Sequence, residues 1–245
     1  MKYLVSILLF LLPARIVYII CRCFRYKGLK LTGKNVKIGF SIIISDYIEL
    51  GDKSSIGHLN FIKCNRLLIN GGYIRHLNFI KGNFSVKINQ KAWINNQNKI
   101  SSIGNTYHDI YLVLHEGAKI GVKHLLDMTD SIIIGKNSML AGADTQIWTH
   151  NFYFSKKSSK IAREDAKVII GSNCYIGARC TIMAGVNISN SITVGAHCCI
   201  SKSLIKEGLY VGQGLRFIEF DPDKKMEKLG IPAYKDFIFR RKQDD

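Results

Sequence analysis

Proline, acidic residues and paired cysteine motifs are all scarce in this chain of 245 residues. It has 3 Pro, 18 Asp and Glu against 35 Lys and Arg, and seven Cys without a CxxC pair. That cysteine spacing excludes zinc fingers and dithiol redox motifs and is typical of a reducing cytosol. The formal net charge of +17 favours anionic partners, such as a phospholipid surface, a phosphorylated cofactor or an acidic glycan.

A hydrophobic run long enough to span a bilayer is also missing. Residues 2–20 are strongly apolar, but Pro13 interrupts them after about a dozen residues, short of the ~20 that a span needs. The basic, bulky segment 21–27 lacks the small residues of a signal-peptide cleavage site. We therefore expect residues 1–28 to contain a short apolar helix that associates with a membrane surface. The alternative is a helix packed on the end of the main domain or on a neighbouring subunit.

What the chain has in abundance is a six-residue repeat. Aliphatic residues recur at every sixth position in its clearest stretch: Ile170, Ile176, Ile182, Ile188, Val194 and Ile200. Neither a helix nor a flat sheet has this period, whereas a solenoid of three short strands per coil of ~18 residues does. The fourth residue after each aliphatic should also point inward, and it is small or modest in size: Cys174, Cys180, Val186, Ile192 and Cys198. Ser138 and Asp144 occupy this inward position in the preceding repeats, which break at Trp148.

The repeat defines the domain organisation. It begins at Val36, becomes less regular between about residues 62 and 110, and returns at Leu114. We interpret the irregular part as solenoid with excursions. The sequence therefore predicts one elongated all-β domain over residues 29–218, with a loop at about 151–167, followed by a C-terminal tail over 219–245.

The loop after the break is the first candidate for chemistry. The segment 145–151 ends a coil at His150, and about fifteen polar, Lys-rich residues follow before Val168 resumes the repeat. A loop that leaves a rigid scaffold is a common place for a site. An imidazole at neutral pH can accept a proton from a hydroxyl group. His150 is therefore a candidate general base.

The segments 134–139, 145–151, 170–177 and 195–202 together resemble the hexapeptide-repeat acyltransferases, especially bacterial sugar and polysaccharide O-acetyltransferases similar to thiogalactoside acetyltransferase. The resemblance covers about residues 112–218. It implies a left-handed parallel β-helix, a homotrimer, and acetyl-CoA as co-substrate with no metal. It also implies that His150 is the general base.

The resemblance further implies cofactor contacts at Tyr175, Ala178, Ala196, Ser201, Lys202 and Arg216. Small side chains would leave a groove for the thin pantetheine arm, and Ser and Lys would contact phosphates. The chain departs from the family at residues 211–216, where a Gly-Val/Ile-Pro-Ala turn is frequent. Either Asp127 or Asp144 could orient His150, and Asp127 is favoured because Asp144 falls in the inward column.

The function expected from these residues is direct transfer of an acetyl group from acetyl-CoA to a hydroxyl of a bacterial cell-surface glycan. The glycan would be a capsule, an O-antigen or a lipid-linked precursor, and the enzyme would lie in the cytoplasm at the inner face of the cell membrane. Inward-facing cysteines argue against a Cys nucleophile. The acceptor sugar and the length of the acyl group stay open.

Two alternatives compete with this interpretation. A β-helix carbonic anhydrase would need three converging His with two of them about five residues apart, and the His residues considered show no such pair: His108, His115, His124, His150 and His197. A non-enzymatic scaffold or glycan-binding module is the other. Nucleic acid is not expected, because interleaved aromatic residues and known binding motifs are missing. Thermal stabilisation by CoA would separate an enzyme from a scaffold.

Overall fold

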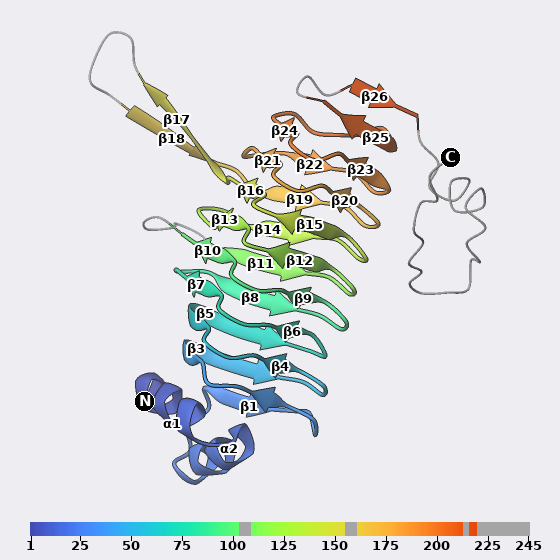
Figure 1. The fold of residues 1–245 in the computed structure, drawn as a ribbon. Coiled ribbons are helices and arrows are strands. Elements are labelled where there is room, and N and C mark those ends of the chain that lie inside the picture. Colours follow the sequence, from blue (N-terminus) through green and yellow to red (C-terminus); the bar gives the residue numbers. More distant parts are fainter. Residues whose placement is uncertain (103–108, 155–160, 213–215, 220–245) are drawn as a thin grey trace, which may run out of the picture.

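The computed structural model describes residues 1–102, 109–154, 161–212 and 216–219, and they form a left-handed parallel β-helix of about nine turns (Figure 1). Its strands pair in parallel with the strands one coil above and below, except for an antiparallel last strand, and within the described residues they form a 14-stranded and a 10-stranded sheet. The larger sheet covers two faces of the prism, because β3 (Ile42–Leu50) and β5 (Phe61–Ile69) each continue around a corner. The predicted fold class is confirmed.

The remaining strands are short, as a coil with three sides requires. On the larger sheet they are β1 (Leu29–Leu31), β7 (Phe79–Lys81), β8 (Ser85–Ile88), β10 (Lys99–Ser101), β11 (Tyr111–Leu114), β13 (Leu125–Asp127), β14 (Ile132–Ile134), β16 (Gln146–Ile147), β19 (Val168–Ile170), β21 (Thr181–Ile182), β22 (Asn187–Ile188) and β24 (Cys199–Ile200). On the smaller sheet they are β2 (Lys37–Ile38), β4 (Ser55–Ile56), β6 (Tyr73–Ile74), β9 (Trp93–Ile94), β12 (Lys119–Val122), β15 (Met139–Ala143), β20 (Tyr175–Ile176), β23 (Ile192–Val194), β25 (Gly208–Val211) and β26 (Arg216–Ile218).

The core is a stack of aliphatic side chains along the prism axis. The aliphatic residues predicted to point inward are buried: Ile134, Leu140, Ile170, Ile176, Ile182, Ile188, Val194 and Ile200. The small inward positions Cys174, Cys180 and Cys198 are buried as well. Each coil therefore buries its side chains against the coils on either side, and removal of apolar area from water stabilises the stack.

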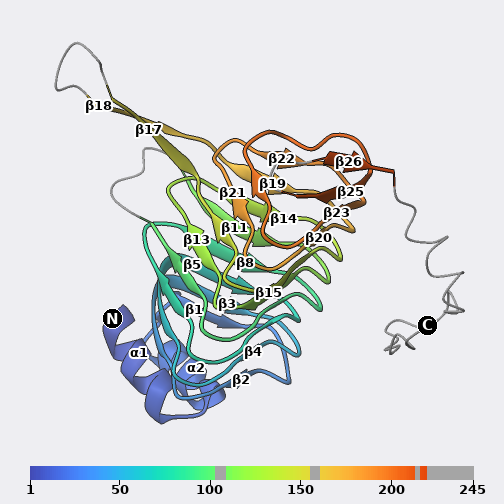
Figure 2. The same cartoon turned by 45° about the horizontal axis from the view of Figure 1, so that its top comes forward.

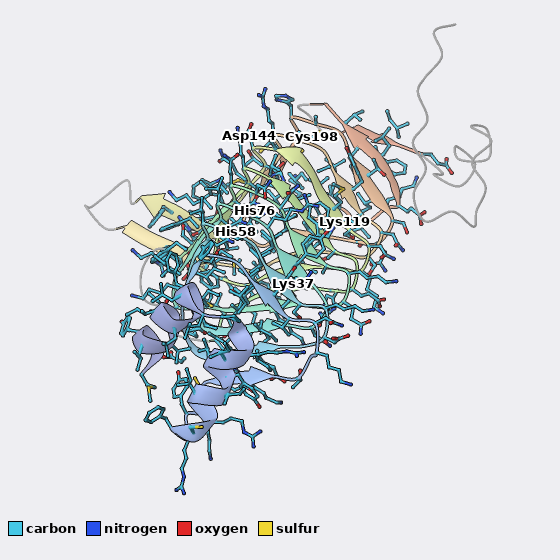
Figure 3. The ribbon with its side chains drawn as sticks, turned by 60° about the horizontal axis from the view of Figure 1, so that its bottom comes forward. Lys37, His58, His76, Lys119, Asp144 and Cys198 are labelled. Atoms are coloured by element: carbon cyan, nitrogen blue, oxygen red, sulfur yellow. The ribbon has the colours of Figure 1, made fainter. Side chains whose placement is uncertain are left out.

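Asp144 is not an inward residue, which corrects the expectation from the repeat. Its side chain is half exposed and lies 3.6 Å from the guanidinium of Arg179 (Figure 3). The reason is a one-residue bulge: Ile120 pairs with Leu140, but Val122 pairs with Ala143. The extra residue shifts the inward position to Thr145, whose side chain is fully buried.

The segment from residue 62 to 110 is solenoid in its described part, with strands that persist while the number of residues per coil varies, as the sequence predicted. Coil positions there align without a shift, as in the register Ile62 to Ile80 and Ile80 to Ile100. The repeat is hard to see in the sequence because coil length changes: paired residues are 18 apart at Ile62 and Ile80, 20 apart at Ile80 and Ile100, and 26 apart at Val86 and Leu112.

Buried amides mark one corner of these coils. The side-chain oxygen of Asn60 accepts the N–H of Asn78 at 2.9 Å, and Asn78 does the same for Asn98. Asn98 then accepts the N–H of His124, and His124 Nδ1 accepts the N–H of Thr145 at 3.0 Å. The ladder satisfies backbone donors that would otherwise be buried without a partner. On the outside of the same coils the rings of His58 and His76 stack 5.6 Å apart (Figure 3).

Two helices rather than one precede the solenoid: α1 (Lys2–Leu11) and α2 (Ala14–Cys23), separated at Pro13. They lie at the end of the molecule formed by the first coil (Figures 1 and 2). Val5 and Leu9 of α1 and Val17 of α2 are buried, and the hydroxyl of Ser6 accepts the N–H of Ile43 on the outermost strand. One face of these helices is therefore packed on the end of the main domain, as the alternative to membrane association predicted. Neither helix, nor any other in the described residues, is long and apolar enough to cross a membrane.

Candidate functional site

His150 and Asp127 form a hydrogen-bonded pair at one edge of the solenoid. Asp127 ends β13 and His150 begins the strand β17 (His150–Phe154), one coil further on. His150 Nδ1 lies 2.8 Å from Asp127 Oδ2, and the two side chains are 11% and 2% exposed. A carboxylate at this distance favours the tautomer with hydrogen on Nδ1, so the lone pair is on Nε2. This imidazole can therefore accept a proton at Nε2.

Two threonines hold the carboxylate in place. Thr129 donates its hydroxyl to Asp127 Oδ1 at 2.9 Å. Thr149 donates its backbone N–H to Asp127 Oδ2 at 3.1 Å, and its hydroxyl lies 2.9 Å from the same oxygen. Both threonines are buried. Because several donors fix the position of this carboxylate, the imidazole that donates to it is held in one orientation.

A surface cavity of about 560 Å³ opens beside this pair. Its lining comes from strand β17, from Trp148 just before it, and from the outer surface of the next two coils: Trp148, His150, Asn151, Phe152, Tyr153, Thr181, Met183, Ala184 and Ser201. The rings of Trp148 and Phe152 meet the imidazole edge-on, with centroids 5.9 and 5.1 Å away. The site is thus a hollow with aromatic walls, one imidazole and the hydroxyl-bearing side chains of Tyr153, Thr181 and Ser201, a composition that suits a small-molecule site.

The predicted loop at 151–167 begins and ends as a β-hairpin. Strands β17 and β18 (Ile161–Asp165) pair antiparallel, and the hairpin projects away from the solenoid (Figures 1 and 2). Residues 155–160 lie outside the described part. His150 and Phe152 share one face of β17, opposite Asp165 and Arg163, whose side chains form a two-pronged ion pair at 2.8 Å. The hairpin therefore extends one wall of the cavity outward.

Ser201 and Lys202 lie at the same edge as the His150 pair. Ser201 lines the cavity, and Lys202 follows it in an exposed turn. The strand register explains this. Ile147 pairs with Ile182, and Ile182 pairs with Ile200, so the residues that follow these three strands lie above one another in successive coils. The structure therefore brings together four predicted site residues from separate segments of the sequence.

The other predicted cofactor residues lie elsewhere on this chain. Ala178 and Ala196 stack at the turn before the same strands, with the Ala178 carbonyl accepting the N–H of His197 at 2.9 Å. Tyr175 is half exposed on the smaller sheet, between Met139 and Thr193. Within the described residues neither group lines the cavity beside His150. Arg216 is paired with Val211 through its backbone in β26, and its side chain lies outside the described part.

The inward cysteines do not belong to this site. Burial raises the pKa of the Cys174, Cys180 and Cys198 thiols, so each is held in its less nucleophilic, protonated form. The described residues contain no group of three His, Cys, Asp or Glu side chains placed to hold a metal ion.

The sequence reasoning missed the residues that shape the hollow. In the sequence, Trp148 only interrupts the repeat, and Phe152 falls within the predicted polar loop. The aromatic run Phe152-Tyr153-Phe154 is the signal that could have predicted a strand here, because aromatic residues are enriched in strands. Thr149 gave no comparable signal, because its role depends on contact with Asp127 in the preceding coil.

Comparison with known proteins supports the fold from two directions, although no family model matches the chain. The bifunctional protein GlmU of Wigglesworthia glossinidia brevipalpis is 27% identical over 201 residues. Those residues are 79% of this chain and 40% of the relative, so the chain spans less than half the length of that protein. The crystal structure of the polysialic acid O-acetyltransferase OatWY is similar with a TM-score of 0.50 and 23% identity, covering 78% of this chain and 88% of OatWY.

These similarities, the six-residue repeat and the coil register agree with one another. The resemblance to the hexapeptide-repeat acyltransferases is confirmed at the level of the fold, and the chain is a left-handed β-helix of the hexapeptide-repeat type.

Proposed function

We propose that this protein transfers an acetyl group from acetyl-CoA to a hydroxyl of a bacterial cell-surface glycan. The observation that carries the proposal is the Asp127–His150 pair at the edge of an open cavity, with Ser201 and Lys202 two coils away. The similarity to a glycan O-acetyltransferase of the same fold supports the reaction class. A scaffold would need neither a buried carboxylate held by threonines nor a hollow beside it.

The chemistry would proceed by direct transfer within a ternary complex, with addition of the acceptor oxygen to the thioester followed by loss of the thiol. His150 Nε2 takes the proton as the acceptor oxygen bonds to the thioester carbonyl carbon, and Asp127 stabilises the imidazolium that forms. Backbone N–H groups beside the coil would stabilise the oxyanion. When the carbon–sulfur bond breaks, the imidazolium returns the proton to the departing sulfur. No step passes through a cysteine.

Acetyl-CoA would lie along the outer surface of the coils after β16. The Ala178 and Ala196 column leaves room for the pantetheine arm, and Ser201 and Lys202 would meet phosphate oxygens. Because Tyr175 lies on another face of the prism, it would contact the cofactor bound at the site of a neighbouring subunit. A homotrimer of the 27.7 kDa chain would bring such faces together. Sedimentation of the active species at three times the chain mass tests this arrangement.

The acceptor would be a capsule, an O-antigen or a lipid-linked precursor at the inner face of the cytoplasmic membrane. The test is incubation of purified protein with labelled acetyl-CoA and glycan fractions, with CoA binding measured separately by thermal shift. Label in an alkali-labile ester on glycan supports the proposal. A protein that CoA does not stabilise and that labels no fraction would contradict it.

A further inference from the structure

The two-helix cap, residues 1–27, has a second face that the solenoid does not cover. Val5, Leu9, Val17 and Cys21 point into the protein, and the opposite side of both helices is exposed. Large apolar side chains on that side are more than half exposed: Tyr3, Leu4, Ile7, Leu11, Ile19 and Phe24. Large apolar side chains exposed together on two packed helices mark an interaction site.

Basic residues predominate around this surface, although Lys2 of α1 is paired with Asp46 at 2.7 Å. Residues 1–45 contain eight Lys and Arg and no Asp or Glu. Arg22, Arg25 and Lys27 are exposed beside the apolar side chains of α2. Apolar side chains bordered by basic residues are complementary to an anionic phospholipid surface. A second copy of the same cap would instead set like charges against each other, so self-association through this face is disfavoured.

A groove at the side of the cap has the same character. It has a volume of about 390 Å³ and lies between α1 and the first coil, lined by Tyr3, Ser6, Ile7, Phe10, Leu11, Ile42 and Ile44. Ser6 is the only lining residue with a short polar side chain, and its hydroxyl already accepts a backbone N–H of the first coil. The groove offers acyl chains an apolar recess at the rim of the surface.

The position of the cap fixes how far the catalytic pair stands from that surface. Going from Ile43 in the first coil, the register passes through Ile62, Ile80, Ile100 and Leu126 to Ile147 beside the site. Five spacings of ~4.8 Å give about 24 Å along the axis. The cap helices add roughly 10 Å, of which about 5–10 Å would enter the headgroup layer.

We propose that the cap docks the solenoid end-on on anionic phospholipid and holds the catalytic pair roughly 25–30 Å above the headgroups. If the protein transfers acetyl groups as proposed, this height has a consequence for the acceptor. The acceptor is a lipid-linked glycan of several sugars, since a single sugar next to its lipid would not reach His150. The surface and its height, in contrast, rest on the cap alone.

Vesicle binding tests the docking surface. The probe is equal parts phosphatidylglycerol and phosphatidylcholine, with pure phosphatidylcholine as reference. Ile7→Glu combined with Ile19→Glu places charge on two exposed positions of the cap, and Ile205→Glu changes a residue that is 80% exposed at the far end. We expect the wild type and Ile205→Glu to sediment with anionic vesicles and the double variant to lose at least about tenfold in partitioning. The proposal would be overturned if all three proteins bind equally or if the wild type does not bind. It would also be overturned if the double variant has a lower oligomeric mass in solution but still binds vesicles, because the exposed face would then be a subunit contact.

Two exposed cysteines allow the height of the solenoid above the membrane to be measured. Of its seven cysteines, Cys23 in the cap and Cys199 on β24 are exposed and the other five are buried. Cys199→Ser and Cys23→Ser each leave one exposed thiol for a fluorophore beside the five buried ones, and nitroxide-headgroup lipids quench only at short range. We expect quenching at Cys23 and none at Cys199; equal quenching would show that the solenoid lies on its side and would overturn the end-on geometry. Neither measurement contains CoA or acceptor, so docking and acetyl transfer can fail separately.

Discussion

The buried imidazole of His124 makes the stability of the solenoid depend on pH. Burial lowers the pKa of His124 from 6.5 to about 4, because the charged form loses its hydration. The depressed pKa means that the contribution of the neutral ring is complete above pH 6.5 and is lost as the pH falls toward 4. At ~1.4 kcal/mol per pKa unit, the loss amounts to about 3 kcal/mol of unfolding free energy.

His124→Asn is the matched variant, because the ladder itself uses Asn at the preceding coils. An Asn oxygen can accept the N–H of Thr145 as His124 Nδ1 does, and it does not titrate in this range. Urea unfolding of both proteins at pH 7, 5.5 and 4 gives the difference, and carboxylates that titrate in both cancel. We expect the wild type to lose about 3 kcal/mol more than the variant between pH 7 and 4. Parallel pH curves would refute the reasoning.

Three further predictions concern the core and the site. Ile188→Asp should destabilise the fold by several kcal/mol, since Ile188 is buried without a cationic partner for the new charge, whereas Asn187→Asp next to it on the exposed side should change thermal stability little. Lys202→Ala should weaken CoA binding roughly tenfold by calorimetry, with turnover at saturation little changed, if Lys202 makes a phosphate contact; unchanged affinity would place the phosphates elsewhere. Asp127→Asn should lower kcat by about 10²- to 10⁴-fold with CoA affinity retained, because the amide no longer fixes the Nδ1–H tautomer; a kcat within threefold of the wild type would separate Asp127 from the mechanism.

Much of the fold could be predicted because the solenoid repeats in space what it repeats in sequence. Ile170 to Ile200 determine both the strand positions and the buried columns. The prediction failed where a local insertion changes the phase. A one-residue bulge in β15 turns Asp144 outward and Thr145 inward, and a period of six cannot detect such a shift.

The candidate site could be predicted only in part, because its geometry depends on contacts between coils. His150 was identified at the point where the repeat breaks, and the structure places Asp127 against it. Thr129 and Thr149 could not be found this way, since their hydrogen bonds to Asp127 follow from stacking rather than from spacing. The hairpin is hard to predict because neither 150–154 nor 161–165 alternates in polarity and the segment between them is rich in Lys and Ser.

The most direct test of the central claim compares acetyl transfer by the wild type and His150→Ala on the acetylated glycan fraction, with CoA affinity measured in parallel. A positioned general base contributes about 10²- to 10⁴-fold in rate, while the imidazole should add little to cofactor binding. We expect the variant to keep its fold and its CoA affinity and to lose at least about a hundredfold in transfer rate. Equal rates for the two proteins would contradict the account.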